Sequence, residues 1–111
     1  MPYIPPGEGQ RKELDPLIDE LAERIVAMAK RGEEGNDFEG PLNYTCTRLG
    51  LKILKLLFGR FRYKRSPVVR GVFHDVASEF YRRLMGPYED KQIEKNGDVD
   101  LYAEFLEEIN K

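Results

Sequence analysis

Residues 14–28 read LDPLIDELAERIVAM, the clearest helical pattern in this 111-residue sequence. Apolar residues recur in it at alternating steps of four and three, the spacing of one face of an α-helix. They are Leu14, Ile18, Leu21, Ile25 and Met28. Asp15 followed by Pro16 is typical of an N-cap with proline at the first helical position. The pattern therefore predicts a long amphipathic helix that starts at this pair and ends at Gly32.

The same spacing recurs in a second predicted helix that begins at Pro41 and ends before Gly59. Its apolar surface extends beyond a single stripe, so other side chains must cover it on more than one side. A monomer of this size rarely wraps one helix completely. We therefore expect a homo-oligomer built around one apolar face of this helix. The residues of that face are Leu49, Ile53, Leu56 and Leu57.

Three further helices complete the predicted fold. Ser66-Pro67 starts a third long helix, which Gly86-Pro87 is expected to end or kink. A short helix over residues 88–95 and a last one capped by Asp98 or Asp100 follow. No comparable stretch alternates as a strand does. The sequence predicts one all-α domain over residues 1–111, a bundle of three long and two short helices, with a proline-rich extended arm at residues 1–10.

Composition limits the class of protein. Hydrophobic residues make up 41% and charged residues 34%, which suits a folded chain. Residues 1–10 lack the apolar core of a secretory signal, and no apolar run reaches the roughly 20 residues of a membrane helix. The single cysteine, Cys46, excludes an intrachain disulfide and fits a reducing compartment. We expect a soluble cytoplasmic protein without a membrane partner.

Positive charge is concentrated in the middle of the chain. Residues 41–70 contain eight basic and no acidic residues, whereas residues 1–40 and 71–111 each contain five basic and ten acidic ones. Arg48, Lys52 and Lys55 form a cationic strip on the second helix, and residues 60–65 read RFRYKR. This block either faces phosphate groups or neutralises the flanking helices. In the first case nucleic acid is the partner, and Phe61 or Tyr63 would stack on its bases.

Pairs of carboxylates are the residues that connect the sequence to a reaction. Glu20 and Glu23 stand three apart on the first helix, where both can reach one hard cation. Asp75 and Glu79 stand four apart on the third helix, a repulsive pair that Arg82 or Arg83 can neutralise. Acidic pairs are common on helices, so each pair taken alone is more typical of an ordinary solvated surface. His74 is the only histidine, and both it and Cys46 are interpreted as structural residues.

Two stretches of the sequence resemble known families. Asp19-Glu20-Leu21-Ala22-Glu23 resembles the E-E-x-x-E signature of the MazG-type all-α NTP pyrophosphatases, whose carboxylates bind magnesium. Residues 87–99, PYEDKQIEKNGDV, together with the opening residues 1–6 and Asn43-Tyr44, resemble a small group of uncharacterised prokaryotic and phage proteins. The second resemblance covers most of the chain and implies no activity.

The pyrophosphatase resemblance implies a fold, a cofactor and a set of site residues. The family's E-x-x-D signature is missing from residues 41–61, which contain no acidic residue. Residues of the third helix would take its place. The implied magnesium ligands are Glu20, Glu23, Asp75 and Glu79, and the implied phosphate-binding residues are Arg48 and Lys52. The first functional hypothesis is therefore a magnesium-dependent nucleoside triphosphate pyrophosphohydrolase relative, active or degenerate.

Two other hypotheses stay open. The chain is either a non-enzymatic oligomeric interaction protein, in which the carboxylates are surface charges, or a nucleic-acid binder that uses its basic central segment. The sequence leaves undecided whether it is an enzyme.

Overall fold

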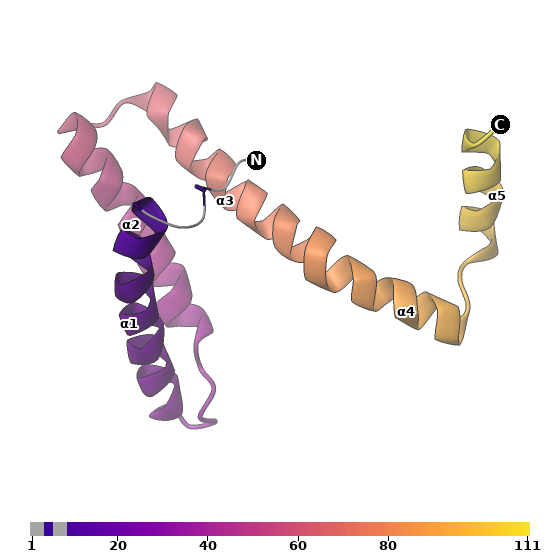
Figure 1. Ribbon diagram of the computed structural model, residues 1–111, viewed down its shortest axis with the longest axis horizontal. Helices are drawn as coiled ribbons and strands as arrows, with labels where there is room; N and C mark the ends of the chain where they lie inside the picture. The colour runs from indigo at the N-terminus through magenta and orange to yellow at the C-terminus, as the bar shows by residue number, and fades with distance from the viewer. Residues whose placement is uncertain (1–3, 6–8) are drawn as a thin grey trace. The chain divides into compact units, whose positions relative to one another are not determined.

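The computed structural model describes residues 4–5 and 9–111, and within these ranges the chain is helical, with no strand (Figure 1). The long α-helices are α1 (Gln10–Lys30), α2 (Glu39–Phe58) and α3 (Ser66–Phe80). The shorter elements are the 3₁₀ turn η1 (Tyr63–Arg65), the π turn η2 (Tyr81–Met85), and the helices α4 (Gly86–Asn96) and α5 (Asp100–Ile109). The predicted all-α class is confirmed.

The chain divides into two compact units, Met1–Ser66 and Pro67–Lys111. The first contains α1, α2 and η1, and the second contains nearly all of α3 together with η2, α4 and α5. A single domain, and a bundle of all the helices around one core, therefore stay predictions.

In the first unit, α1 and α2 lie side by side and are joined by residues 31–38 (Figure 1). Ala29 of α1 and Gly50 of α2 are the buried residues of the described chain, and their small size permits close approach of the backbones. Ile25, Cys46 and Leu54 are half-buried. Most other apolar side chains expected to face inward remain exposed, so both helices retain uncovered apolar surface.

The start of α1 differs from its prediction. The helix begins at Gln10, and Pro16 lies inside it. Proline cannot donate to the carbonyl group four residues earlier, but its fixed φ is helical. The residues before it, from Arg11 to Leu14, are good helix formers, and the Glu13 amide donates to the Gly9 carbonyl group over 3.0 Å. One missing hydrogen bond does not stop the helix from extending before Pro16.

The predicted N-terminal arm falls largely on residues 1–3 and 6–8, which lie outside the described residues. Ile4 and Pro5 are described and are not helical. The Ile4 carbonyl group accepts a hydrogen bond of 2.7 Å from Nε of Arg11.

In the second unit, residues 66–96 form one helical run, because η2 joins α3 directly to α4. At Gly86-Pro87, where an end or a kink was predicted, the chain stays helical, but the α-helical hydrogen bonding of α3 gives way to the π turn directly before Gly86. The Gly86 amide donates to the Tyr81 carbonyl group five residues earlier. This π-type hydrogen bond replaces the α-helical pattern of backbone hydrogen bonds just before Pro87. A Cβ atom on residue 86 would lie 3.2 Å from the Tyr81 carbonyl oxygen, so glycine suits this close approach.

A side-chain hydrogen bond also spans the π turn. The Tyr81 hydroxyl group donates to Oε2 of Glu89 over 2.6 Å. This hydrogen bond raises the pKa of Tyr81 above 10.0, and the negative charge of Glu89, slight desolvation and the charge of Asp90 add to the effect. An ionised phenolate would lose the hydrogen bond and face a carboxylate.

We expect Glu89→Gln to lower the pKa of Tyr81 toward its ordinary value, because it removes the facing charge. Since folding raises this pKa, the stabilisation by the hydrogen bond is complete below about pH 10 and is lost as the pH rises through the folded value. An NMR titration of the Tyr81 ring carbons measures the pKa. Glu94→Gln, with the same charge change elsewhere on α4, is the control. A pKa equally insensitive to both changes would contradict the role of Glu89.

The predicted stop at Asn96-Gly97 is confirmed. Gly97 has a φ of 91°, which glycine adopts without strain, and its amide donates to the Ile93 carbonyl group over 2.8 Å. At the start of α5, Oδ1 of Asp98 accepts from the Val99 amide and Oδ1 of Asp100 from the Leu101 amide. The N-cap residue of α5 is Val99, however, and no side chain forms a capping hydrogen bond there, so the predicted cap by Asp98 or Asp100 is wrong. Each aspartate binds only the amide of the next residue, whereas a capping side chain binds an amide two or three residues on.

Candidate functional site

A turn at the end of α2 reverses the basic connector, residues 59–65. Gly59 has a φ of 75°, and its amide donates to the Lys55 carbonyl group over 2.9 Å, which closes the helix. Arg62 is extended, and the Arg65 amide then donates to the Arg62 carbonyl group in η1. This path returns Arg65 to α2, where Cζ of Arg65 lies 4.8 Å from the centre of the Phe58 ring. The distance is that of a cation–π contact.

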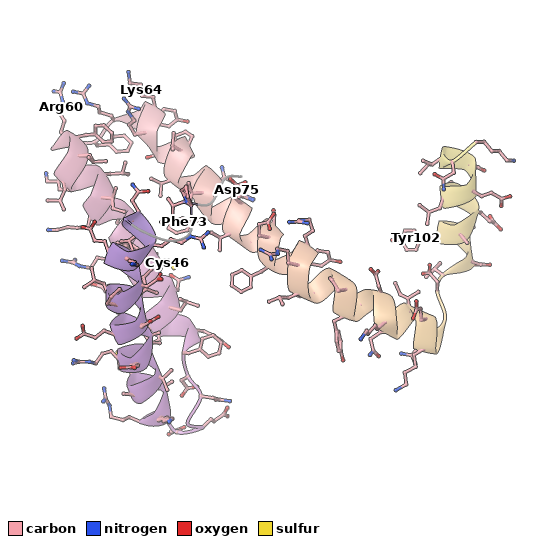
Figure 2. The ribbon with its side chains drawn as sticks, viewed as in Figure 1. Cys46, Arg60, Lys64, Phe73, Asp75 and Tyr102 are labelled. Atoms are coloured by element: carbon pink, nitrogen blue, oxygen red, sulfur yellow. The ribbon has the colours of Figure 1, made fainter. Side chains whose placement is uncertain are left out.

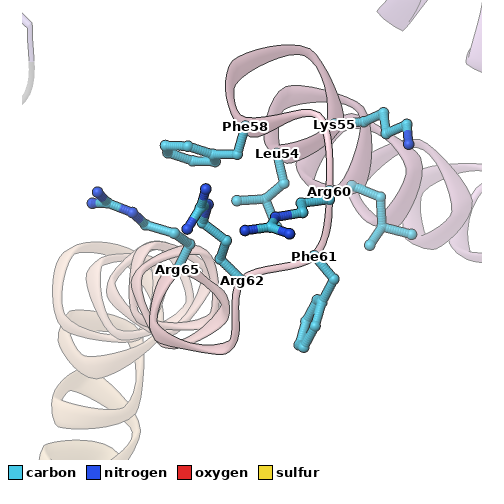
Figure 3. Close-up of a pocket in the computed structure, with 8 residues that line it drawn as sticks. Leu54, Lys55, Phe58, Arg60, Phe61, Arg62 and Arg65 are labelled. Atoms are coloured by element: carbon cyan, nitrogen blue, oxygen red, sulfur yellow. The ribbon is translucent and has the colours of Figure 1, made fainter.

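The reversed connector and the last turns of α2 enclose a cavity of about 280 Å³, which we call the connector pocket. Figure 3 shows the side chains of Arg60 and Arg62 directed toward the same space as Leu54 and Phe58. The pocket is lined by Leu51, Leu54, Lys55, Phe58, Arg60, Phe61, Arg62 and Arg65. It therefore combines an apolar, partly aromatic wall with four cationic side chains.

The charge of this pocket is not balanced by its own lining. None of the lining residues is acidic, and the whole of residues 41–70 contains no carboxylate. Like charges held close together repel one another, and a bound anion relieves that repulsion. The connector pocket therefore favours a ligand that carries negative charge and also has an apolar or aromatic part.

A second cavity, of about 320 Å³, lies farther back along α2, and we call it the strip pocket. It is lined by Tyr44, Thr47, Arg48, Leu51, Lys52 and Lys55. The three cations are those of the predicted cationic strip, so the two predicted phosphate-binding residues, Arg48 and Lys52, line one cavity. The Thr47 hydroxyl group donates to the Asn43 carbonyl group over 2.8 Å.

Residues of the connector that have the same predicted role differ in whether they line the connector pocket. Of the two aromatic residues proposed to stack on bases, Phe61 lines the connector pocket and Tyr63 does not. Arg62 likewise lines the pocket, whereas Lys64 does not. Figure 2 labels Arg60 and Lys64 on this connector. Tyr44, which lines the strip pocket, is not among the predicted site residues, although its position four residues before Arg48 places it on the face of the cationic strip.

The four predicted magnesium ligands are divided between the units. Glu20 and Glu23 are exposed on α1, in the first unit. Asp75 is exposed and Glu79 half-buried on α3, in the second unit (Figure 2 labels Asp75). Within residues 4–5 and 9–111, no group of three or more His, Cys, Asp or Glu side chains is placed to hold a metal ion. The four-carboxylate site stays a prediction.

Glu79 has an arginine partner. Nη2 of Arg82 lies 2.9 Å from Oε2 of Glu79, and both Nε and Nη2 of Arg82 donate to Oε1. The neutralisation of Glu79 by Arg82 that the spacing predicted is therefore present. A metal ion at Glu79 would have to compete with this ion pair.

The two residues interpreted as structural are placed differently. Cys46 is half-buried in α2, and His74 is exposed on α3. In the described part of the chain, no helix has both the length and the apolar character needed to cross a membrane.

A family model described as Domain of unknown function (DUF6899) matches residues 1–99. The chain belongs to the DUF6899 family. The matched part of this DUF6899 chain contains both pockets and ends directly before α5. No curated protein and no solved structure matches the chain.

Proposed function

We propose that this protein binds nucleic acid through the connector pocket. The supporting observation is that four cationic side chains and the exposed ring of Phe61 line one cavity with no acidic residue among them. Phosphate groups of a nucleic acid pair with lysine and arginine, and its bases stack on aromatic rings and guanidinium planes. The pocket supplies both kinds of contact.

The apolar wall distinguishes this ligand from a simple anion. A phosphate ion would gain no favourable contact from Leu54 and Phe58, and placing its charge against this apolar surface would cost desolvation free energy. A nucleotide unit places a flat base on such a wall and its phosphate beside the guanidinium groups. The composition of the pocket thus favours a nucleic acid over an inorganic anion.

Fluorescence anisotropy with labelled DNA and RNA oligonucleotides at low salt tests the proposal. We expect binding that weakens steeply as salt is added, since phosphate contacts release counterions. Failure of every single-stranded and duplex probe to bind at low salt would overturn the proposal.

We propose magnesium-dependent hydrolysis of nucleoside triphosphates to nucleoside monophosphates and pyrophosphate as a second candidate. The observation in its favour is that Arg48 and Lys52, the implied phosphate-binding residues, line the strip pocket together. In this proposal Glu20 and Glu23 of α1 and Asp75 and Glu79 of α3 would hold the metal ion, which would orient water and neutralise the phosphates.

Magnesium should then raise the Tm, because a cation that binds only the native state stabilises it. Glu23→Gln should abolish this rise and leave the Tm without magnesium unchanged or higher, since repulsion between carboxylates is reduced. Glu33→Gln, the same charge change in the loop after α1, should keep the rise. A melting curve unmoved by millimolar magnesium or manganese, with pyrophosphate release at the rate without protein, would remove this candidate.

We also propose that the protein self-associates through the apolar face of α2. The four residues of this face are exposed, Leu56 by 74% and Leu57 by 70%. An uncovered face of this kind marks an interaction surface.

A further inference from the structure

We propose that the two pockets form one continuous track along α2 that holds a single strand of nucleic acid of about six nucleotides. This inference rests on the proposed function and specifies its ligand. The decisive observation is that Leu51 and Lys55 line both pockets, so the two pockets adjoin on α2.

An aromatic ring stands at each end of this track. Tyr44 lines the far end of the strip pocket, and Phe61 lines the connector pocket. Both rings are exposed, by 64% for Tyr44 and 74% for Phe61, so both have faces available for stacking. Stacking on an aromatic side chain needs a base whose own face is free, which a single strand provides and an intact duplex does not.

The cations between the two rings lie on one side of the helix. Arg48, Lys52 and Lys55 follow Tyr44 at steps of four, four and three, which on an α-helix keeps them on one face. At the end of this row, the side chains of Arg60, Arg62 and Arg65 line the connector pocket together with Phe58. A chain of phosphates laid along this face therefore meets a cation at each turn.

The length of the track sets the length of the ligand. Phe58, the last residue of α2, follows Tyr44 by fourteen positions, which corresponds to about 21 Å at 1.5 Å per residue. Stacked nucleotides advance by about 3.4 Å each along one strand, so about six of them span this distance. A mononucleotide fills one end only.

A length series tests the track. Oligothymidylates of two, four, six, eight and twelve nucleotides are compared by anisotropy at one low salt concentration, together with a twelve-base-pair duplex. We expect affinity to rise steeply up to about six nucleotides and only slightly beyond, and the duplex to bind more weakly than the twelve-nucleotide single strand. A hexamer that binds no more tightly than a dimer, or a duplex that binds more tightly than the strand, would overturn the track.

Tyr44→Ala isolates the far end. It should weaken binding of the hexamer about tenfold. The dimer, which we expect to bind at Phe61, should be unaffected, whereas Phe61→Ala should weaken binding of both oligonucleotides. Tyr63→Ala, which removes an exposed connector ring outside both pockets, is the control and should change neither. Binding that Phe61→Ala weakens and Tyr44→Ala does not, at every length, would refute the track and leave the proposed function standing. Absence of binding by every probe would instead refute both.

Discussion

Reversing the charges of Arg60 and Arg62 to glutamate should lower the affinity for a single-stranded oligonucleotide on the order of 100-fold at 50 mM salt. Each phosphate contact with a single strand contributes a slope of about −0.7 to the dependence of log K on log salt. At 50 mM salt, each contact therefore raises the affinity about tenfold over its value at 1 M salt. Two lost contacts therefore account for the effect, and repulsion by the new carboxylates adds to it.

The salt dependence gives a second readout of the same change. Six cations line the two pockets, so the wild-type slope should be about −4, and affinity should fall by about 300-fold between 50 and 200 mM salt. In the double variant the slope should fall in magnitude to about −3. A change in slope separates the loss of phosphate contacts from a general loss of structure, which circular dichroism checks directly.

The matched control reverses Lys64 and Arg70, two cations of the same segment that line neither pocket. The formal charge change is identical, so any effect of net charge alone appears in both variants. We expect this control to keep the wild-type slope and most of the affinity. Equal losses in the two double variants would show that the basic segment acts as a diffuse charge, without a pocket.

Local sequence signals identified most of the fold. The apolar spacing predicted α1, α2 and α3, and Gly59 and Gly97 ended helices where expected because a positive φ suits glycine. Two differences from the prediction concern proline. Pro16 lies inside α1. Pro87 lies in the helical run of residues 66–96, directly after the π turn that joins α3 to α4. A proline marks a lost hydrogen bond, and whether the helix stops there depends on the hydrogen bonds that its neighbours make instead.

The candidate site was only partly predictable. The charge count located the basic connector, and the helical period located Arg48, Lys52 and Lys55 on one face. The reversal after Gly59 that brings Arg65 over Phe58 depends on backbone angles, and these decide that Phe61 lines a cavity and Tyr63 does not. Spacing along the chain carries no such information for an irregular segment.

The sequence also predicted that α2 has more apolar surface than one neighbour can cover. In the structure, Gly50 is buried on one side of α2, the cationic strip occupies another, and Leu49, Ile53 and Leu56 remain exposed. Leu56 lies about 140° around the helix from Leu51, which lines both pockets. Self-association through the apolar face would therefore leave the track accessible, and the two proposals can be tested by separate variants.

Leu56→Glu should dissociate the oligomer that we propose. Burial of a leucine side chain contributes about 1.5–3 kcal/mol, and a two-fold symmetric interface contains this side chain twice. Its replacement by a carboxylate loses that contribution and would place an unpaired charge in an apolar contact. The dissociation constant should consequently rise by more than about 100-fold. Because Leu56 is 74% exposed in the single chain, the fold of α2 should tolerate the change.

Light scattering at micromolar concentration measures the result. The wild type should have a mass that is a multiple of 12.9 kDa, and Leu56→Glu should shift it to 12.9 kDa. Leu51→Glu, the same substitution on the pocket side of α2, should retain the oligomer and lose nucleic-acid affinity, since it places a negative charge among the cations of both pockets. A wild type that is already a clean 12.9 kDa species would contradict self-association. An oligomer lost equally in both variants would instead place the contact elsewhere than on the face of Leu49, Ile53, Leu56 and Leu57, because the two substituted positions point to different sides of the helix.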